Sequence, residues 1–575
     1  MHDSERYILG IHDGHNCGAT LTRGGTIVAS VSEERLVRRK NAIGYPSRSI
    51  EEVLRIGGIS ARDLSEVTYA SLFMHTPSHL EDISQWYAVG IEEQIADARQ
   101  PPEYGRSIFE TRKRERIAQA ARHLGIPDAR VSFVEHHLAH LAAAYFTAPR
   151  ATADGPVLGL TCDGAGDGLC ATVSICRGNT IERIAKTDRN ASLGKIYSRV
   201  TYLMGMTPWE HEYKLMGLAP YADPQRSEDA ARQLHDLLGL SDDGLGFALK
   251  TELSTNYCYR HLRAAFERVR FDTIAGATQR FTEEMLIGWV RGCIKATGIA
   301  DIVCGGGVFM NVKANMLIAE MPEVRSIYVM PSASDESLSI GACLSRFYDG
   351  ARGADSRGSR LAHLYLGGQD TAAAESSAVE AARSRMQVAV AQPSDMNAAI
   401  ADRLAAGEIV AVCRGPMEWG ARALGNRSIM SSADNYRRVD DINQMIKMRD
   451  FWMPFAPSIR AEAAGRYFDG IKGIDYGFMT FAAPVRPAAF EEIIAGSHPK
   501  DRTIRPQVVT ATANPDYHAV ISHFEQLTRR GAILNTSFNL HGEPIVATSE
   551  DAIRVMSLSG IQHLALNRHL LSKQQ

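Results

Sequence analysis

Short apolar runs alternate with longer helical patterns along most of the chain, which is typical of an α/β protein. Residues 7–11 form an apolar run that ends in a polar turn, and a hairpin pattern follows over 19–22 and 26–30. A strand is predicted at 131–134, with a helix directly after it. Residues 73–110 show neither period, so the pattern predicts an irregular surface excursion there.

The first of these patterns occurs twice. The segments ILGIHDGHNCGATLTRGGTIVASV, from Ile8, and VLGLTCDGAGDGLCATVSICRGNTIERIA, from Val157, share a strand, an Asp-Gly turn and a hairpin. They lie about 150 residues apart, which indicates an internal duplication. Two such halves resemble the actin-like ATPase superfamily, in which the two turns grip nucleotide phosphates from opposite sides. Small residues let backbone N–H groups approach a phosphate, while the Asp can hold a metal ion.

The pattern restarts in the C-terminal part. A polar, Gly- and Ser-rich stretch at 350–360 predicts a linker. Beyond it, a strand is predicted at 388–391 and a buried strand at 409–413, each preceded by a helical pattern. We therefore expect two domains, 1–350 and 361–575.

Composition and charge narrow the possible partners. Lys and Arg number 63 against 66 Asp and Glu, so no net charge attracts the chain to nucleic acid or to an anionic membrane. No run of about 18 apolar residues occurs, and the N-terminus is too polar for a signal peptide. The nine cysteines form no Cys-x-x-Cys pair, which favours reduced thiols. We expect a cytoplasmic protein without nucleic-acid or membrane partners.

Three histidines follow the strand predicted at 131–134. On a helix His136 and His140 share a face, while His137 points elsewhere. The spacing of the first two suits two imidazole nitrogens that bind one metal ion. A helix start that is merely His-rich is the alternative, so a metal site needs further ligands from elsewhere in the chain.

The C-terminal domain carries the densest polar pattern. Residues 414–428 directly follow a buried strand, and Lys447, Arg449, Arg505 and Asn535 come later. Cations with amide and hydroxyl donors at strand ends favour a site for a small oxyanion such as phosphate or carboxylate. Surface arginines paired with acids would explain each Arg singly.

Two further stretches are less specific. Gly305, Gly306 and Gly307 follow a predicted strand, and such a turn can cradle a ribose or a phosphate, although a glycine triplet is more often a tight turn. The charged stretch 33–40 leaves the first hairpin, and its composition alone predicts a solvated edge.

Three motifs give the chain a family resemblance: Pro416–Ser428 (PMEWGARALGNRS), Ile446–Ser458 (IKMRDFWMPFAPS) and Asn535–Val546 (NTSFNLHGEPIV). They resemble the carbamoyltransferase family, which includes nodulation and antibiotic-tailoring O-carbamoyltransferases. The match extends in order over GGGVFMN, KLMGLAPY, HHLAH and the first turn, so it spans essentially the whole chain. Ala421 and Met453 depart from it, standing where many members have Pro and Arg.

The resemblance implies a duplicated actin-like (ribonuclease-H-like) N-terminal domain and a smaller YrdC-like α/β C-terminal domain. The C-terminal domain would break carbamoyl phosphate to carbamate and join it to ATP, with Mg²⁺ as a possible companion of ATP, to give carbamoyl adenylate. The N-terminal domain would then pass the carbamoyl group to an acceptor hydroxyl and release AMP. Carbamate is short-lived in water, so a water-excluding path would prevent its loss.

The resemblance also implies roles for single residues. The metal ligands would be His136, His140, Asp163 and Asp335, a nitrogen and oxygen set compatible with Fe(II), Mn or Zn, of which the family suggests iron. The residues expected to bind the nucleotide are Lys40, Asp163, Lys214, Gly305, Gly306, Gly307 and Asn311. For Lys40, the resemblance therefore favours nucleotide binding over the solvated edge that composition alone predicts. The residues expected to hold carbamoyl phosphate are Arg422, Lys447, Arg449, Arg505 and Asn535.

For the transfer step, His15 is expected to be the general base, with His12 and Asp13 helping to bind the acceptor. A histidine in such a turn could equally be a structural hydrogen-bonding residue. The acceptor is expected to be a hydroxyl of a small natural product, although an amine is an alternative, and a homodimer is possible. Two other functions fit the duplicated turns: an actin-like sugar kinase and an ATP-switched scaffold without enzymatic activity. Neither accounts for the His pair together with the Arg-rich C-terminal domain.

Overall fold

The computed structural model describes residues 6–100, 102–149, 155–350, 360–447 and 450–574. Most of the linker predicted at 350–360 therefore lies outside the described residues. The chain forms two compact units, of which the first consists of Met1–Glu33 and Asn41–Leu361. The second consists of Glu34–Lys40 and Ala362–Gln575. The segment 34–40, which the sequence places in the N-terminal domain, thus belongs to the second unit.

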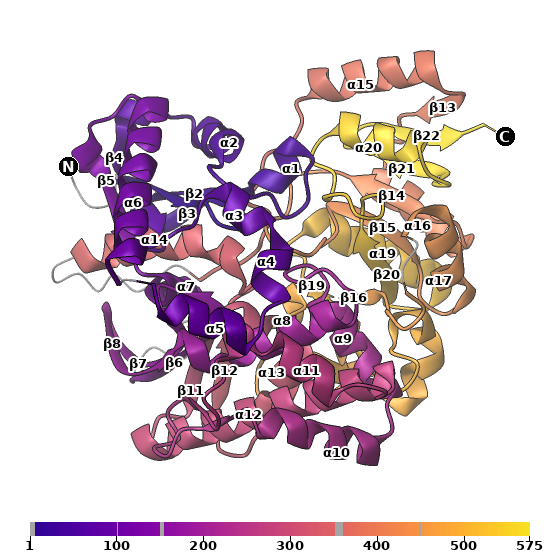
Figure 1. The fold of residues 1–575 in the computed structure, drawn as a ribbon. Coiled ribbons are helices and arrows are strands. Elements are labelled where there is room, and N and C mark those ends of the chain that lie inside the picture. The colour runs from indigo at the N-terminus through magenta and orange to yellow at the C-terminus, as the bar shows by residue number, and fades with distance from the viewer. Residues whose placement is uncertain (1–5, 101, 150–154, 351–359, 448–449, 575) are drawn as a thin grey trace. The chain divides into compact units, whose positions relative to one another are not determined.

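The first unit begins with a five-stranded sheet in the order β3-β2-β1-β4-β5 (Figure 1). Strand β1 (Tyr7–His12) pairs antiparallel with β2 (Gly18–Arg23), which pairs in the same way with β3 (Thr26–Ser32). On its other side β1 runs parallel to β4 (Leu64–Ala70), and β4 runs parallel to β5 (Val131–Val134). The predicted first hairpin is confirmed.

The second sheet of this unit repeats that plan. Strand β6 (Val157–Gly166) pairs antiparallel with β7 (Leu169–Arg177), which pairs with β8 (Thr180–Asp188). Strands β11 (Asp301–Gly305) and β12 (Ser326–Val329) continue the sheet in parallel from β6. Both sheets therefore have three antiparallel strands followed by two parallel ones in the same order, which confirms the duplicated ribonuclease-H-like fold.

Two helices connect the repeats closely. Helix α7 (His136–Thr147) packs against α14 (Leu338–Gly350), and α14 also contacts β1 (Figure 1). A Cβ at Gly341 would lie only 1.7 Å from the carbonyl oxygen of Ala139, so no larger residue fits at this crossing. The start of α14 is thereby fixed beside the start of α7. Further helices and strands of this unit are α2 (Ser47–Gly57), α8 (Leu193–Leu203), α9 (Glu212–Leu218), α10 (Pro224–His235), β9 (Leu238–Leu240), β10 (Phe247–Leu249), α11 (Tyr259–Ala265), α12 (Phe271–Thr297) and α13 (Val312–Glu320).

The excursion predicted at 73–110 is largely helical, so the expectation of an irregular segment is wrong. Its helices are α3 (Pro77–Glu81), α4 (Ile83–Tyr87), α5 (Ile91–Ala98) and the start of α6 (Pro102–Leu124). Helix α6 is missed because its charged residues lie all around the axis and leave no apolar stripe.

The second unit is built on an eight-stranded mixed sheet in the order β13-β22-β21-β14-β15-β20-β16-β19. Helices α16 (Met396–Ala405) and α19 (Pro515–Thr528) pack against each other, and Ile400 and Phe524 belong to the apolar core that they share with the sheet. The strands of this sheet are β13 (Val388–Ala391), β14 (Val410–Cys413), β15 (Arg427–Ser432), β16 (Ala456–Arg460), β19 (Gln507–Val509), β20 (Ala532–Ser537), β21 (His563–Ala565) and β22 (Leu570–Lys573), and a separate two-stranded sheet pairs β17 (Ala483–Pro484) with β18 (Thr503–Ile504). The other helices are α15 (Ala372–Arg385), α17 (Arg437–Ile442), α18 (Ala464–Tyr467) and α20 (Ser549–Ser557). The predicted smaller α/β domain is confirmed as an α/β unit.

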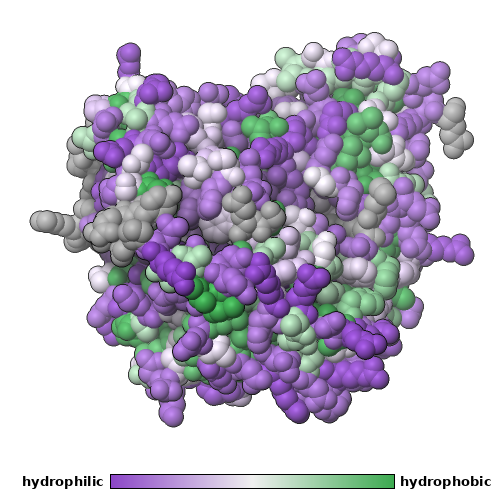
Figure 2. All heavy atoms as spheres, in the orientation of Figure 1, coloured by the Kyte–Doolittle hydropathy of each residue, from purple (hydrophilic) through white to green (hydrophobic). Residues whose placement is uncertain are grey.

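The surface is mixed in polarity. The face shown in Figure 2 is mainly hydrophilic, with apolar residues in scattered groups. Among the described residues, no helix is both long and apolar enough to cross a bilayer.

Candidate functional site

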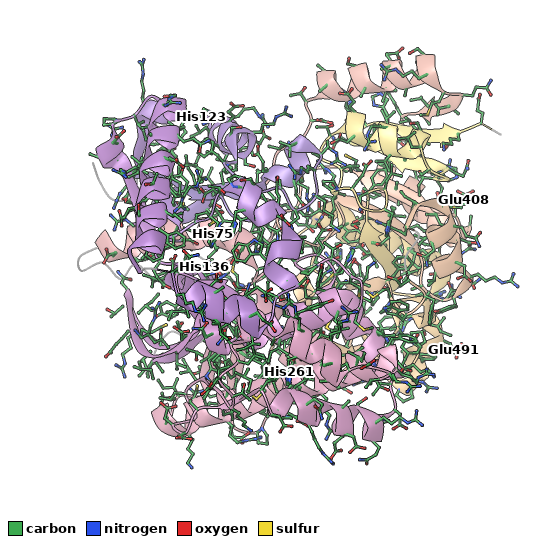
Figure 3. All side chains as sticks on the ribbon, viewed as in Figure 1. His75, His123, His136, His261, Glu408 and Glu491 are labelled. Carbon is green, nitrogen blue, oxygen red and sulfur yellow. The ribbon has the colours of Figure 1, made fainter. Side chains whose placement is uncertain are left out.

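Four side chains that are far apart in the sequence converge in the first unit. His136 and His140 come from α7, Asp163 from β6 and Asp335 from the turn before α14 (His136 is labelled in Figure 3). One ligand atom of each lies within 4.8 Å of those of the other three. The His136 Nε2 atom is 3.2 Å from Asp163 Oδ2, and the His140 Nε2 atom is 3.5 Å from Asp335 Oδ1. The structure therefore brings together the four residues expected to bind a metal.

Two serine hydroxyls orient these imidazoles. The Nδ1 atom of His136 lies 2.9 Å from the Ser71 hydroxyl, and that of His140 lies 3.2 Å from the Ser337 hydroxyl. Both rings therefore direct Nε2 toward the carboxylates, as metal-binding histidines do when a neighbour holds the other nitrogen. His137 bonds instead to the Thr161 hydroxyl at 2.8 Å, outside the cluster. The two serines were not predicted, because no spacing in the sequence connects them to the histidines.

The electrostatics of the cluster fit a cation. Burial opposes protonation of His136, but the hydrogen bond to Asp163 and the charge of Asp335 raise its pKa to about 9. Burial opposes ionisation of both carboxyls, yet the facing imidazoles hold their pKa values below the ordinary range. The His140 Nε2 and Asp335 Oδ1 atoms are buried and have no hydrogen-bond partner within the part of the chain that the structure describes. Two nitrogen and two oxygen donors, with two atoms unsatisfied, fit a divalent transition metal.

The glycine triplet lies against the same carboxylates. The Gly307 N–H donates to Asp163 Oδ1 at 2.9 Å, and Gly306 has φ 99°, a conformation that favours glycine. A Cβ on Gly306 would lie 2.3 Å from the carbonyl oxygen of Cys162. Asn311, however, caps α13 through its Oδ1 and bonds to the side-chain amide of Gln279 through both polar atoms. The predicted nucleotide contact of Asn311 therefore has no support, whereas the predicted role of the triplet stays open.

The first turn places a further pair of imidazoles beside Asp335. The His15 Nε2 atom lies 3.3 Å from Asp335 Oδ2, and the His12 Nε2 atom lies 3.6 Å from the same oxygen. His12 also bonds through Nε2 to the His15 carbonyl at 3.0 Å, and burial lowers its pKa to about 4. The His15 Nδ1 atom is buried without a hydrogen-bond partner among the described residues. Asp335 thus faces the metal-type cluster with one oxygen and the first turn with the other.

Asp13 has a different environment from its neighbours in this turn. Its two oxygens accept hydrogen bonds from Arg116 Nε and Nη2 at 3.0 and 2.9 Å, and both side chains are fully buried. Arg116 also donates to two backbone carbonyls and stacks on the rings of Tyr69 and Phe133. Since both oxygens of Asp13 are used inside the protein, the acceptor-binding role predicted for it has no support in the structure.

The oxyanion-type site predicted in the second unit is built on one loop. Glu418 is buried, and its Oε1 atom accepts hydrogen bonds from the N–H groups of Leu424, Asn426 and Arg427. This carboxylate folds the loop that carries Arg422. Arg427 is itself buried and donates to four backbone carbonyls, so its role is structural.

One predicted donor, Asn535, lies next to this loop. Asn535, on β20, donates through Nδ2 to the Ala423 carbonyl at 3.0 Å and to Gln507 Oε1 at 3.0 Å. Gln507 in turn donates to the Leu424 carbonyl at 2.9 Å. The structure therefore places Asn535 beside the loop of Arg422 and in contact with Gln507, which is two positions after Arg505 in the sequence.

Lys447 contacts residues at the C-terminal end of β20. It is buried, and its Nζ donates to Asn539 Oδ1 at 2.6 Å and to the Ser537 hydroxyl at 3.1 Å. Arg449 lies outside the described residues. The anion-binding roles of Arg422, Lys447, Arg449, Arg505 and Asn535 stay predictions.

The segment 34–40 is not a solvated edge. Arg35 is buried and donates to the Gly420 carbonyl at 2.7 Å, and Arg38 donates to the carbonyls of Pro544 and Ile545 at 2.8 and 2.6 Å. The interpretation from composition is wrong because these guanidinium groups satisfy backbone carbonyls of the second unit. Lys40 belongs to this segment, whereas Lys214 lies on α9 of the first unit. Their nucleotide-binding roles stay predictions.

The chain combines duplicated ribonuclease-H-like sheets, which carry a buried His and Asp cluster, with a second α/β unit that bears Arg and Lys side chains. The model of the carbamoyltransferase N-terminus matches residues 7–344, and that of the carbamoyltransferase C-terminus matches residues 401–573. The chain belongs to the carbamoyltransferase family, and it is a transferase.

The chain is similar to two named relatives and to a solved structure. The chain is 28% identical to the nodulation protein NolNO of Sinorhizobium fredii over 98% of this chain and 79% of that protein. It is 34% identical to the 3'-hydroxymethylcephem-O-carbamoyltransferase of Streptomyces clavuligerus, over 30% of this chain and 32% of that protein. Among solved structures, full-length HypF in its phosphate- and nucleotide-bound form is similar over 61% of this chain and 56% of that chain, at 14% identity and a TM-score of 0.33.

Proposed function

We propose that the protein is an ATP-dependent O-carbamoyltransferase that uses carbamoyl phosphate to carbamoylate a hydroxyl of a small natural product. The observation that carries the proposal is the first turn of the duplicated fold. There, an imidazole with an unsatisfied ring nitrogen shares a carboxylate with a metal-type cluster. Membership of the carbamoyltransferase family supports the group transferred.

The second unit forms the activated donor in this proposal. Water hydrolyses carbamoyl phosphate to carbamate and phosphate, and a carbamate oxygen then attacks the α-phosphorus of ATP. Carbamoyl adenylate forms and pyrophosphate leaves. Arg422, Lys447, Arg449, Arg505 and Asn535 hold the anions and balance their charge.

The first unit transfers the carbamoyl group. The acceptor oxygen forms a bond to the carbamoyl carbon, the bond from this carbon to the AMP oxygen breaks, and AMP leaves. His15 takes the hydroxyl proton as general base. Asp335 Oδ2, 3.3 Å from His15 Nε2, orients the ring so that Nδ1 presents its lone pair.

A divalent ion, iron in the expectation from the family, would be held by His136, His140, Asp163 and Asp335. It would supply positive charge next to the nucleotide phosphates. The residues around it have their own tasks. Ser71 and Ser337 orient the imidazoles, and the glycine triplet lets backbone N–H groups approach an anion.

The first test separates the reaction classes. The purified protein is incubated with ATP, carbamoyl phosphate and radiolabelled pyrophosphate without an acceptor. Carbamoyl-phosphate-dependent exchange of label into ATP is expected, because adenylate formation is reversible. Formation of ADP, or exchange that does not depend on carbamoyl phosphate, would refute the proposal. Acceptors are then sought as compounds that gain a carbamoyl mass, starting with 3'-hydroxymethylcephems and aminoglycosides.

Two variants separate the stages. His15→Ala should abolish transfer to the acceptor and leave the exchange reaction intact, whereas Arg505→Ala should suppress both. The matched controls are His261→Ala and Arg437→Ala, two exposed residues of the corresponding units (His261 is labelled in Figure 3). Full transfer activity in His15→Ala would remove His15 from the base role.

A further inference from the structure

Trp209 covers the face of the proposed base. Its ring lies flat against the imidazole of His15, with 4.7 Å between ring centroids and 17° between the planes. The edge of the same imidazole faces Asp335, at 3.3 Å. A ring held at its edge by a carboxylate and on its face by an indole cannot turn about χ2 without losing one of the two contacts.

The indole is itself anchored in the protein. The ring centroids of Trp209 and Tyr87 lie 5.9 Å apart, with 76° between the ring planes. The guanidinium of Arg199 stacks over the Tyr87 ring, 4.3 Å from its centroid. Tyr87 and Arg199 are buried, and Arg199 donates to the Trp86 carbonyl at 2.8 Å. His15 is therefore the outermost member of a layered column that ends in the core of the first unit.

The backbone at Trp209 adopts a conformation that favours glycine. Its φ is 68°, in the left-handed region, where a bulky side chain is a real outlier. The Trp209 N–H donates to Glu212 Oε1 at 2.8 Å, and the Thr207 N–H donates to His211 Nδ1 at 3.0 Å. Two side-chain hydrogen bonds within the loop of residues 207–212 thus hold Trp209 in a backbone conformation that is unfavourable for a large side chain. Strain retained in this way is found where the position of the side chain matters for function.

We infer that Trp209 is a positioning residue of the transfer site: it fixes the orientation of the His15 ring for proton transfer from the acceptor hydroxyl. The inference rests on the proposed function, because it requires His15 to act in transfer. It assigns a role to the loop 207–212, whose sequence carries no recognisable catalytic motif. Trp209 acts through His15 and does not react itself.

The experiment compares three variants at one position. Trp209→Ala removes the ring, Trp209→Phe keeps an aromatic face, and Trp209→Gly removes the ring and also suits the positive φ. The transfer rate is measured with the best acceptor of the cephem and aminoglycoside panel, and pyrophosphate exchange is measured without acceptor. A misplaced base costs on the order of 100-fold in kcat. We therefore expect kcat for transfer to fall by about that factor in the Ala and Gly variants, with KM for the acceptor nearly unchanged.

Two further results are expected. Trp209→Phe should recover most of the transfer rate, and all three variants should exchange pyrophosphate at the wild-type rate. Trp209→Gly should unfold at a higher temperature than Trp209→Ala, since glycine relieves the backbone strain, yet transfer no faster. A purely structural role would instead make transfer follow stability across the series.

An independent measurement follows the imidazole directly. The His15 side chain is 18% exposed and is covered by the indole on one face. Its carbethoxylation by diethyl pyrocarbonate, located by peptide mass, should become faster in Trp209→Ala and stay near the wild-type rate in Trp209→Phe. Wild-type kcat for transfer in Trp209→Ala, with exchange intact, would overturn the inference. Absence of carbamoyl-phosphate-dependent exchange in the wild type would refute the proposed function instead.

Discussion

Glu212 supports the loop that carries Trp209, and its effect on the stability of the fold depends on pH. Its Oε1 atom accepts the Trp209 N–H at 2.8 Å at the start of α9. Burial, together with the charge of Glu210, raises the Glu212 pKa from its ordinary 4.5 to about 7, although backbone hydrogen bonds oppose the shift. The folded state therefore favours the protonated carboxyl more than the unfolded state does.

The sign and size follow from the two pKa values. A raised folded-state pKa gives a stability contribution that is complete below pH 4.5 and is lost as the pH rises through about 7. A difference of about 2.5 at ~1.4 kcal/mol per pH unit amounts to about 3 kcal/mol. The side chain is only partly shielded from solvent, so this figure is an upper bound. Glu212→Gln keeps an oxygen for the Trp209 N–H and removes the ionisation.

The assay is urea unfolding between pH 4.5 and 8. Trp419 and Trp452 are replaced by Phe, so that the fluorescence reports the first unit. Relative to the Gln variant, the parent should lose up to about 3 kcal/mol of unfolding free energy across this range. Glu267→Gln, at an exposed position in the same unit, should leave the pH dependence unchanged. A parent and a Glu212→Gln variant with parallel curves would refute the reasoning.

Three other outcomes test the site. His140→Ala should abolish binding of Fe(II) measured by metal analysis after anaerobic loading, whereas His137→Gln, whose parent side chain lies outside the cluster, should retain it. Gly166→Ala should also weaken metal binding, because the added Cβ would lie 2.1 Å from the ring of His136. Gly164→Ala, with only ordinary contacts, is its control. Arg116→Met should destabilise the first unit by about 3–5 kcal/mol in urea unfolding, since it leaves a buried carboxylate without its partner; a loss below about 1 kcal/mol would contradict this.

The fold could largely be predicted from the sequence because its signals are local and repeated. The two strand, turn and hairpin segments starting at Ile8 and Val157 have matching order, and they become matching sheets. The helices between 73 and 124 could not be predicted. The charges of the longest of them, α6, surround its axis, and periodicity detects only a helix that buries one side.

The candidate site could be predicted only in part. The spacing of His136 and His140 indicated a shared face, and the resemblance to the carbamoyltransferase family supplied the two carboxylates. Spacing could not show that Ser71 and Ser337 orient the rings, because these contacts depend on the register of distant segments. Spacing likewise could not show that Asp13 pairs with Arg116, because Arg116 lies on α6, a helix that the pattern does not predict.

Asp335 connects the parts of the site that the sequence presents separately. Its Oδ1 faces the imidazoles of α7, while its Oδ2 faces those of the first turn, about 320 residues earlier in the chain. The close crossing of α14 over α7 at Gly341 fixes the carboxylate in this position. A change in the position of Asp335 therefore alters the metal-type cluster and the orientation of His15 together. Asp335→Asn should consequently impair both metal binding and transfer, whereas loss of Trp209 should impair transfer alone.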